Sequence, residues 1–100
     1  MSNVTNSTRA AVDYKYYATA GSADINLVTD RPGYANRANT GDTAPLLPRK
    51  ICVYGDGNLT ITDVYGNAVT MAITAPWSAE ISPVSITQAT TTATKILVLW

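Results

Sequence analysis

The chain has 100 residues with seven basic and seven acidic side chains, and this length supports one domain with a modest core. Only 14% of the residues are charged, so the surface is thinly protected against association and we expect self-assembly or a fixed partner. Histidine is absent, which excludes the commonest general base and the commonest zinc ligand.

The first half of the chain predicts two strands and a long loop. Residues 1–9 form a polar arm in this interpretation, and a single β domain follows over residues 10–100. Residues 10–18 alternate as a first strand, with Tyr14 and Tyr16 in the core and Tyr17 outward, and residues 23–29 form a second strand.

A loop over about residues 30–48 is predicted by its density of Gly, Pro, Asn and Asp. Loops of this length in compact domains usually serve a contact or are disordered. Because it holds Arg31, Tyr34 and Arg37, one interpretation is a loop that grips a partner. A plain flexible excursion is the other.

The second half predicts a meander of short strands. K-I-C-V-Y and L-T-I-T flank Asp56-Gly57, a dipeptide typical of a tight hairpin turn, and Gly66-Asn67 gives a second turn before A-V-T-M-A-I. The segment A-P-W-S breaks the meander, and K-I-L-V-L-W closes the chain. Between them I-S-P-V-S-I-T-Q forms a strand, in which Pro83 indicates either an edge position or a late start. About seven short strands predict an all-β fold, a small antiparallel β-sandwich or jelly-roll-like barrel.

Nothing in the chain is arranged for catalysis. The turn G-D-G-N lacks the following helix of a phosphate loop and the spaced oxygens of a calcium loop. Asp56, Asp63 and Glu80 occupy ordinary positions beside turns and strands, and Cys52 reads as a buried inert thiol. We therefore expect no enzyme activity, no catalytic residue, no cofactor and no metal.

Nucleic acid and membranes are not expected partners either. The first fifty residues hold six basic and four acidic side chains, which is too weak an excess for a surface that tracks phosphates. The longest aliphatic run, I-L-V-L-W, is far shorter than a membrane span.

The aromatic and apolar residues of the second half are the best candidates for contacts. The closing strand is apolar on both faces, so it must be covered by its own fold as a central strand or by a second subunit. We favour the central strand, with Trp100 reaching a subunit contact. The expected interface residues are Arg31, Tyr34, Arg37, Trp77, Leu97, Leu99 and Trp100. A carbohydrate-binding module using Trp77 and the tyrosine cluster is the alternative.

The segments L-L-P-R-K-I-C-V-Y-G-D-G-N-L-T-I-T-D and A-T-T-T-A-T-K-I-L-V-L-W resemble the head-spike base and small capsid decoration proteins of tailed phages and gene-transfer agents. The resemblance covers about residues 42–100 and rests on residues 53–57 and 91–100. It implies a non-enzymatic subunit on the surface of the virion capsid, made in the host cytoplasm. The implied partners are the major capsid protein, further copies of itself as a pentamer rather than a trimer, and a fibre protein.

Overall fold

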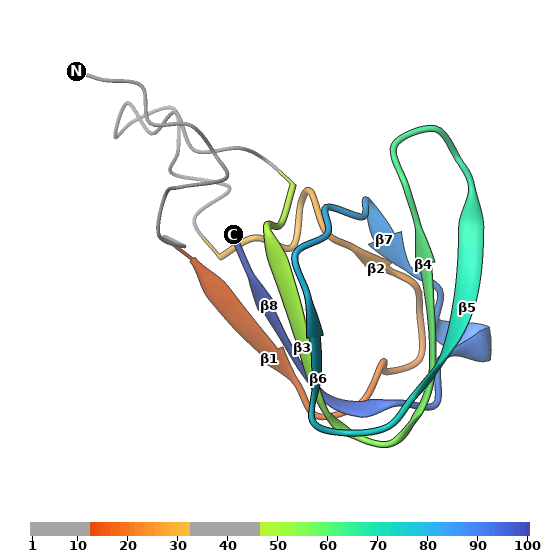
Figure 1. The fold of residues 1–100 in the computed structure, drawn as a ribbon. Coiled ribbons are helices and arrows are strands. Elements are labelled where there is room, and N and C mark those ends of the chain that lie inside the picture. Colours follow the sequence, from red (N-terminus) through yellow and green to blue (C-terminus); the bar gives the residue numbers. More distant parts are fainter. Residues whose placement is uncertain (1–12, 33–46) are drawn as a thin grey trace.

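Two antiparallel four-stranded sheets pack face to face as a β-sandwich in a computed structural model, which describes residues 13–32 and 47–100 (Figure 1). This confirms the predicted fold class. The polar arm and most of the long loop lie outside the described residues. Sheet A has the order β1 (Tyr14–Tyr17), β8 (Thr94–Leu99), β3 (Lys50–Gly55), β6 (Trp77–Ala79). Sheet B has the order β2 (Ile25–Asn26), β7 (Ser85–Ile86), β4 (Gly57–Thr62), β5 (Ala68–Ile73).

The core lies between the sheets and follows the period-two alternation of their strands. Ile51 and Val53 of β3 and Ile96 and Val98 of β8 have no exposed surface, and Leu59 of β4 meets them from the other sheet. The described part of the chain contains no helix that is long and apolar enough to cross a membrane.

β8 is a central strand of sheet A, as expected, because it pairs with β1 on one side and β3 on the other. Trp100 follows it and is fully buried, and its indole Nε1 donates a hydrogen bond of 2.9 Å to the Leu27 carbonyl. This position differs from the expectation that Trp100 reaches a subunit contact. The core itself buries the large indole ring, and the Leu27 carbonyl accepts its one hydrogen bond.

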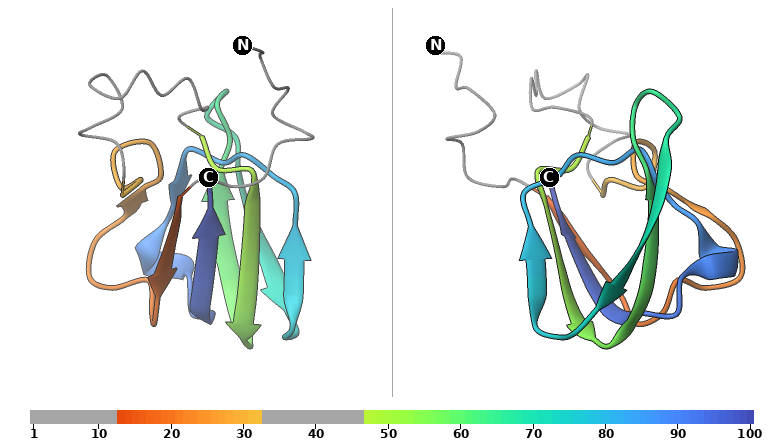
Figure 2. Two further views of the ribbon diagram at one scale, coloured as in Figure 1. Left: turned by 90° about the vertical axis from the view of Figure 1, so that its left-hand side faces the viewer. Right: turned by 45° about the vertical axis from the view of Figure 1, so that its right-hand side comes forward.

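The predicted hairpin at Asp56-Gly57 is wrong. β3 and β4 belong to different sheets, so the chain turns a corner there and crosses from sheet A to sheet B (Figure 2, right). Gly57 has φ +150°, and a Cβ on it would lie 2.5 Å from the Ala93 backbone nitrogen. The Asp56 carboxylate accepts a hydrogen bond of 2.7 Å from the Ala75 N–H, which ties the corner to the start of the next crossing.

The second predicted turn, at Gly66-Asn67, is a hairpin joining β4 to β5. Gly66 has φ +86°, and the Asp63 carboxylate accepts from the N–H groups of Tyr65 and Asn67 at 2.8 and 2.9 Å. The expected break at A-P-W-S is wrong for its last residues, since Trp77–Ala79 forms β6 and pairs with β3.

A group of threonines joins the segment before β8 to the outer side of sheet B. The Thr60 hydroxyl lies 2.7 Å from the hydroxyls of both Thr70 and Thr90, and the Thr60 N–H donates to the Thr91 hydroxyl at 3.0 Å. Thr92 N–H donates to the Asn58 carbonyl at 2.8 Å. These bonds explain the threonine tract. Strand β7 pairs with β4 only at Ile61 and Thr62, and the threonines supply hydrogen bonds to the β4 backbone at Asn58 and Thr60 in its place.

Candidate interaction face

The side of sheet A that faces away from sheet B is the candidate site. Directly opposite residues of an antiparallel pair share a face, and Tyr14 pairs with Leu99, Tyr16 with Leu97, and Cys52 with both Leu97 and Ser78. We call this surface the outer face of sheet A. It comprises Tyr14, Tyr16, Lys50, Cys52, Tyr54, Ser78, Leu97 and Leu99. No described segment crosses in front of these strands (Figure 2, left).

This face is apolar and aromatic over its centre. Leu97 and Leu99 are half-buried between strands, whereas Tyr14, Tyr16 and Tyr54 are 71%, 55% and 51% exposed. The Cys52 thiol is buried, and the charge and hydrogen bond of its sulfur raise the pKa of the Tyr54 phenol above the ordinary value. A contiguous exposed apolar face of this kind is typical of a protein contact surface.

The expectation that Tyr14 and Tyr16 lie in the core, with Tyr17 outward, is wrong. The inward-facing residues of β1 are Lys15 and Tyr17, and both contact the Asp30 carboxylate. The Lys15 ammonium lies 3.1 Å from Asp30, and the Tyr17 hydroxyl donates a short hydrogen bond to the same group. Both inward-facing side chains of β1 therefore bind the same carboxylate, which comes from a separate segment of the chain.

The electrostatics of this cluster follow from its contacts. Burial raises the pKa of Tyr17, and the hydrogen bond and charge of Asp30 raise it further. For Asp30, partial burial raises the pKa, but hydrogen bonds from Tyr17 and Lys15 outweigh it, so the net pKa is lowered. The result is an ionised Asp30 beside a neutral phenol and an ammonium group, an arrangement that stabilises the β1 edge.

The residues expected at an interface are distributed over several places. Leu97 and Leu99 lie on the outer face of sheet A. Arg31 is buried and forms an ion pair with Asp13, next to the start of β1. Trp77 pairs with Val53 on the inner side and packs against the core. Tyr34 and Arg37 lie outside the described residues.

The sequence prediction did not include Tyr14, Tyr16 and Tyr54 among the interface residues. Three tyrosines crowd the first strand, and alternation alone fits either phase. The only signal that places Tyr14 and Tyr16 outward is their register with Leu99 and Leu97, which is a property of the folded sheet.

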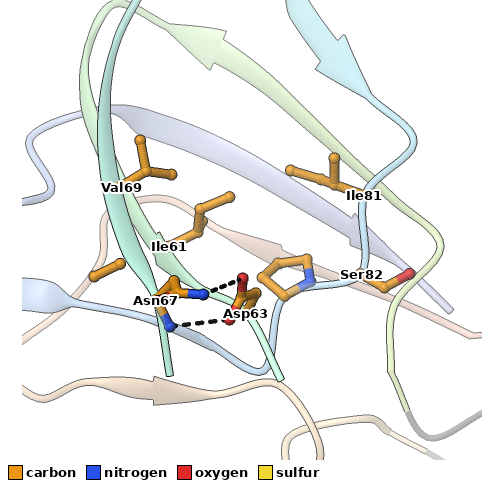
Figure 3. Close-up of a pocket in the computed structure, with 8 residues that line it drawn as sticks. Ile61, Asp63, Asn67, Val69, Ile81 and Ser82 are labelled. Atoms are coloured by element: carbon orange, nitrogen blue, oxygen red, sulfur yellow. Dashed lines mark hydrogen bonds between the residues drawn. The ribbon is translucent and has the colours of Figure 1, made fainter. Parts of the chain in front are cut away.

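A pocket of about 370 Å³ opens beside the β4–β5 hairpin (Figure 3). Its walls are mainly aliphatic, with Ile61 and Val69 on one side and Ile81 and Pro83 on the other. Asp63 at its rim serves the turn, because its carboxylate accepts hydrogen bonds from the backbone N–H groups of Asn67 and Tyr65, and these bonds lower the pKa of the carboxyl. Within residues 13–32 and 47–100, no three His, Cys, Asp or Glu side chains gather as a metal site.

Comparisons with known proteins add one informative match. No protein-family model matches the chain, and no curated protein matches its sequence. A chain in the solved structure described as "Capsid of native GTA particle computed with C5 symmetry" is similar, with a TM-score of 0.63 and 21% sequence identity. The match covers 98% of this chain and 92% of that one. The likeness is one of fold.

Proposed function

We propose that the protein is a non-enzymatic structural subunit of a virion: a capsid decoration or head-spike base protein that binds the major capsid protein and self-assembles. The observation that carries this proposal is the shared fold, over nearly the whole chain, with a chain from the capsid of a native GTA particle. The resemblance of residues 42–100 to head-spike base proteins is an independent, sequence-level argument for the same role.

The outer face of sheet A supports the adhesive part of the proposal. Tyrosine side chains around a leucine pair can bury a large area when a partner binds, and they lose little side-chain entropy in doing so, which is why tyrosines are common at protein contacts. Tyr14 and Tyr16 provide the aromatic rim, and Leu97 and Leu99 the apolar centre. This face is our candidate for the grip on the major capsid protein, with the opposite surface left for a fibre.

The subunit count that we propose is five, with three as the competing number. Two different patches that meet head to tail give a closed ring when the rotation between subunits closes. The similar chain belongs to a capsid particle computed with C5 symmetry, and a five-fold axis of a particle would accommodate a ring of five.

The described acidic groups and Cys52 support a non-enzymatic role. Asp56 and Asp63 are both occupied by backbone N–H groups at turns, and Cys52 is buried. The carbohydrate-binding alternative relied on Trp77 as an exposed platform, and this residue packs against the core instead. No second function is proposed.

Native mass spectrometry of the purified protein, combined with co-sedimentation on capsid particles from cells that express it, tests the proposal. We expect a defined oligomer built from rings of five copies that pellets with capsids, and its peptides should be present in purified virions. A folded monomer that stays in the supernatant would overturn the proposal.

A further inference from the structure

The four edge strands of the sandwich differ in how well they are protected. An exposed edge presents unpaired N–H and C=O groups, and proteins usually blunt it with short strands, charges or proline. β2 has two residues and β6 has three. β1 carries the Lys15–Asp30 ion pair along its length. These three edges are blunted in the expected ways.

β5 is the exception. It runs for six residues, Ala68–Ile73, with the sequence A-V-T-M-A-I, and contains no charge and no proline. Within the described chain it pairs with β4 alone, at every position. Ala68, Val69, Thr70 and Ala72 are exposed. An edge that is long, uncharged and rich in β-forming residues is suited to accept another strand.

We infer that the free edge of β5 pairs with β5 of a second copy of this chain, antiparallel across a two-fold axis, to give one continuous eight-stranded sheet. The occupant is argued from self-complementarity. Across such an axis, opposite residues share a face only if the axis passes beside a residue and not between two residues, since side chains alternate with period two. The two registers that pair the most of β5 place the axis beside its central residues, Thr70 or Met71. In both registers apolar or uncharged residues oppose one another, and no like charges meet.

The pocket beside the hairpin supports the same contact. Val69 is half-exposed on the inner side of β5 and forms part of the pocket wall with Ile61 and Ile81 (Figure 3). The residue opposite Val69 is the partner subunit's Met71 or the partner subunit's Ile73, according to register. The partner subunit's Met71 is only partly buried and would lie beside the mouth of this pocket, so in that register strand pairing and side-chain burial occur at one place, whereas Ile73 is buried in the core of its own subunit.

This inference is independent of the proposed function. The β5 edge belongs to sheet B, whereas the candidate face for the capsid belongs to sheet A. A two-fold contact at β5 joins copies in pairs, and a ring formed through other surfaces is a separate property.

Cysteine cross-linking tests the contact directly. Directly opposite Cα atoms in an antiparallel pair are about 4.5–5.5 Å apart, within the range of about 4.4–6.8 Å that a disulfide spans. In a Cys52→Ser background, Thr70→Cys and Met71→Cys are each treated with diamide and run on a non-reducing gel. We expect a covalent dimer from the position next to the axis. Ser22→Cys, at an exposed residue outside the strands, is the control and should stay monomeric.

A charge on the edge tests it in a second way. Ala72→Lys adds a lysine to the paired edge of each copy, one residue from an axis at Met71 and two residues from an axis at Thr70. Because a charge on an edge strand disfavours pairing with another strand, we expect self-association measured by analytical ultracentrifugation to weaken at least about tenfold. Ala23→Lys is the matched control, an exposed alanine outside the strands that should leave association unchanged. Circular dichroism verifies that each variant is folded.

The outcomes separate cleanly. No cross-link at either position in a folded protein, or association that ignores Ala72→Lys, overturns the β5 contact. A ring that binds capsids but forms none of these cross-links would contradict the β5 contact alone, and the proposed function would still be supported. A β5 edge reserved for a strand of the capsid protein would give a monomer without cross-links, and it too would overturn the pairing of two copies.

Discussion

Gly57 occupies a point where the backbone has no room for a side chain. A Cβ there would lie 2.5 Å from the Ala93 nitrogen and 2.6 Å from the Thr92 carbonyl carbon, and both are backbone atoms that cannot rotate away. We expect Gly57→Ala to lower the free energy of unfolding by about 2–4 kcal/mol, through overpacking and an unfavourable φ. Urea denaturation followed by circular dichroism measures the loss.

Gly21 is the matched control for this substitution. It also has a positive φ, +82°, but nothing lies within 4 Å of the position of its Cβ. Gly21→Ala should therefore cost only the conformational penalty, about 1 kcal/mol. Equal losses of unfolding free energy at Gly57 and Gly21 would show that the close backbone contact between Gly57 and Ala93 does not affect stability.

Asp30 gives the fold a defined acid sensitivity. Its pKa is lowered, because hydrogen bonds from Tyr17 and Lys15 outweigh the raising effect of partial burial. A carboxyl with a lower pKa in the folded state stabilises fully above its ordinary pKa of 3.8 and loses that stabilisation as the pH falls through the lowered value. The difference in unfolding free energy between wild type and Asp30→Asn should thus shrink on acidification. Urea titrations from pH 7 to pH 2 test this, and a difference independent of pH would contradict it.

Among the elements, β8 contributes the largest share of sheet A, because it pairs with both β1 and β3 and ends in the buried Trp100. Deleting residues 97–100 should unfold the chain, with loss of the β-sheet circular dichroism signal and of cooperative melting. The control is the double variant Leu97→Thr, Leu99→Thr, which keeps the backbone pairing and should remain folded. A truncated chain that stays folded but no longer associates would show that β8 is a subunit contact instead.

The elements also show what sequence reasoning can and cannot reach. The turn at Gly66-Asn67 and the closing strand were predicted, because each is specified by residues adjacent in the chain. Asp56-Gly57 was assigned to a hairpin, yet the same local signal serves a corner between sheets. Whether two strands pair is decided by tertiary contacts, here the backbone around Ala93 that packs against Gly57. β6 was missed for a related reason, since three residues after a proline form a strand only because β3 lies beside them.

The candidate site was predictable to a similar extent. Leu97 and Leu99 could be named from the sequence, because they alternate with the core residues of an apolar strand. Tyr14 and Tyr16 could not, because alternation fits either phase of the strand and the register that turns them outward forms only in the folded sheet. The role of these residues at an interface remains a prediction.

On the scale of the whole molecule, the outer face of sheet A is expected to drive assembly while contributing little to folding. The double variant Tyr14→Glu, Tyr16→Glu changes side chains that are 71% and 55% exposed, so its melting temperature should stay close to that of wild type. Under the proposed function, capsid binding should fall at least about tenfold, since charges replace the aromatic rim of the contact.

Tyr65→Glu is the control, at a residue 86% exposed on the β4–β5 hairpin and away from this face. It should bind capsids as wild type does in the same co-sedimentation assay. Equal loss in both variants would point to a general effect of added negative charge, and no loss in either would move the contact to another surface.

The register of β1 with β8 also affects when the outer face becomes available. Tyr14 lies opposite Leu99, so two segments separated by nearly the whole described chain must meet before this surface exists. Pairing over such sequence distances is slow, with folding times of roughly milliseconds to seconds in all-β domains. Neither segment alone presents the tyrosine rim together with the leucine pair. A partner that recognised this face would therefore select chains in which β1 and β8 have already paired, and copies without that pairing would not present the contact surface.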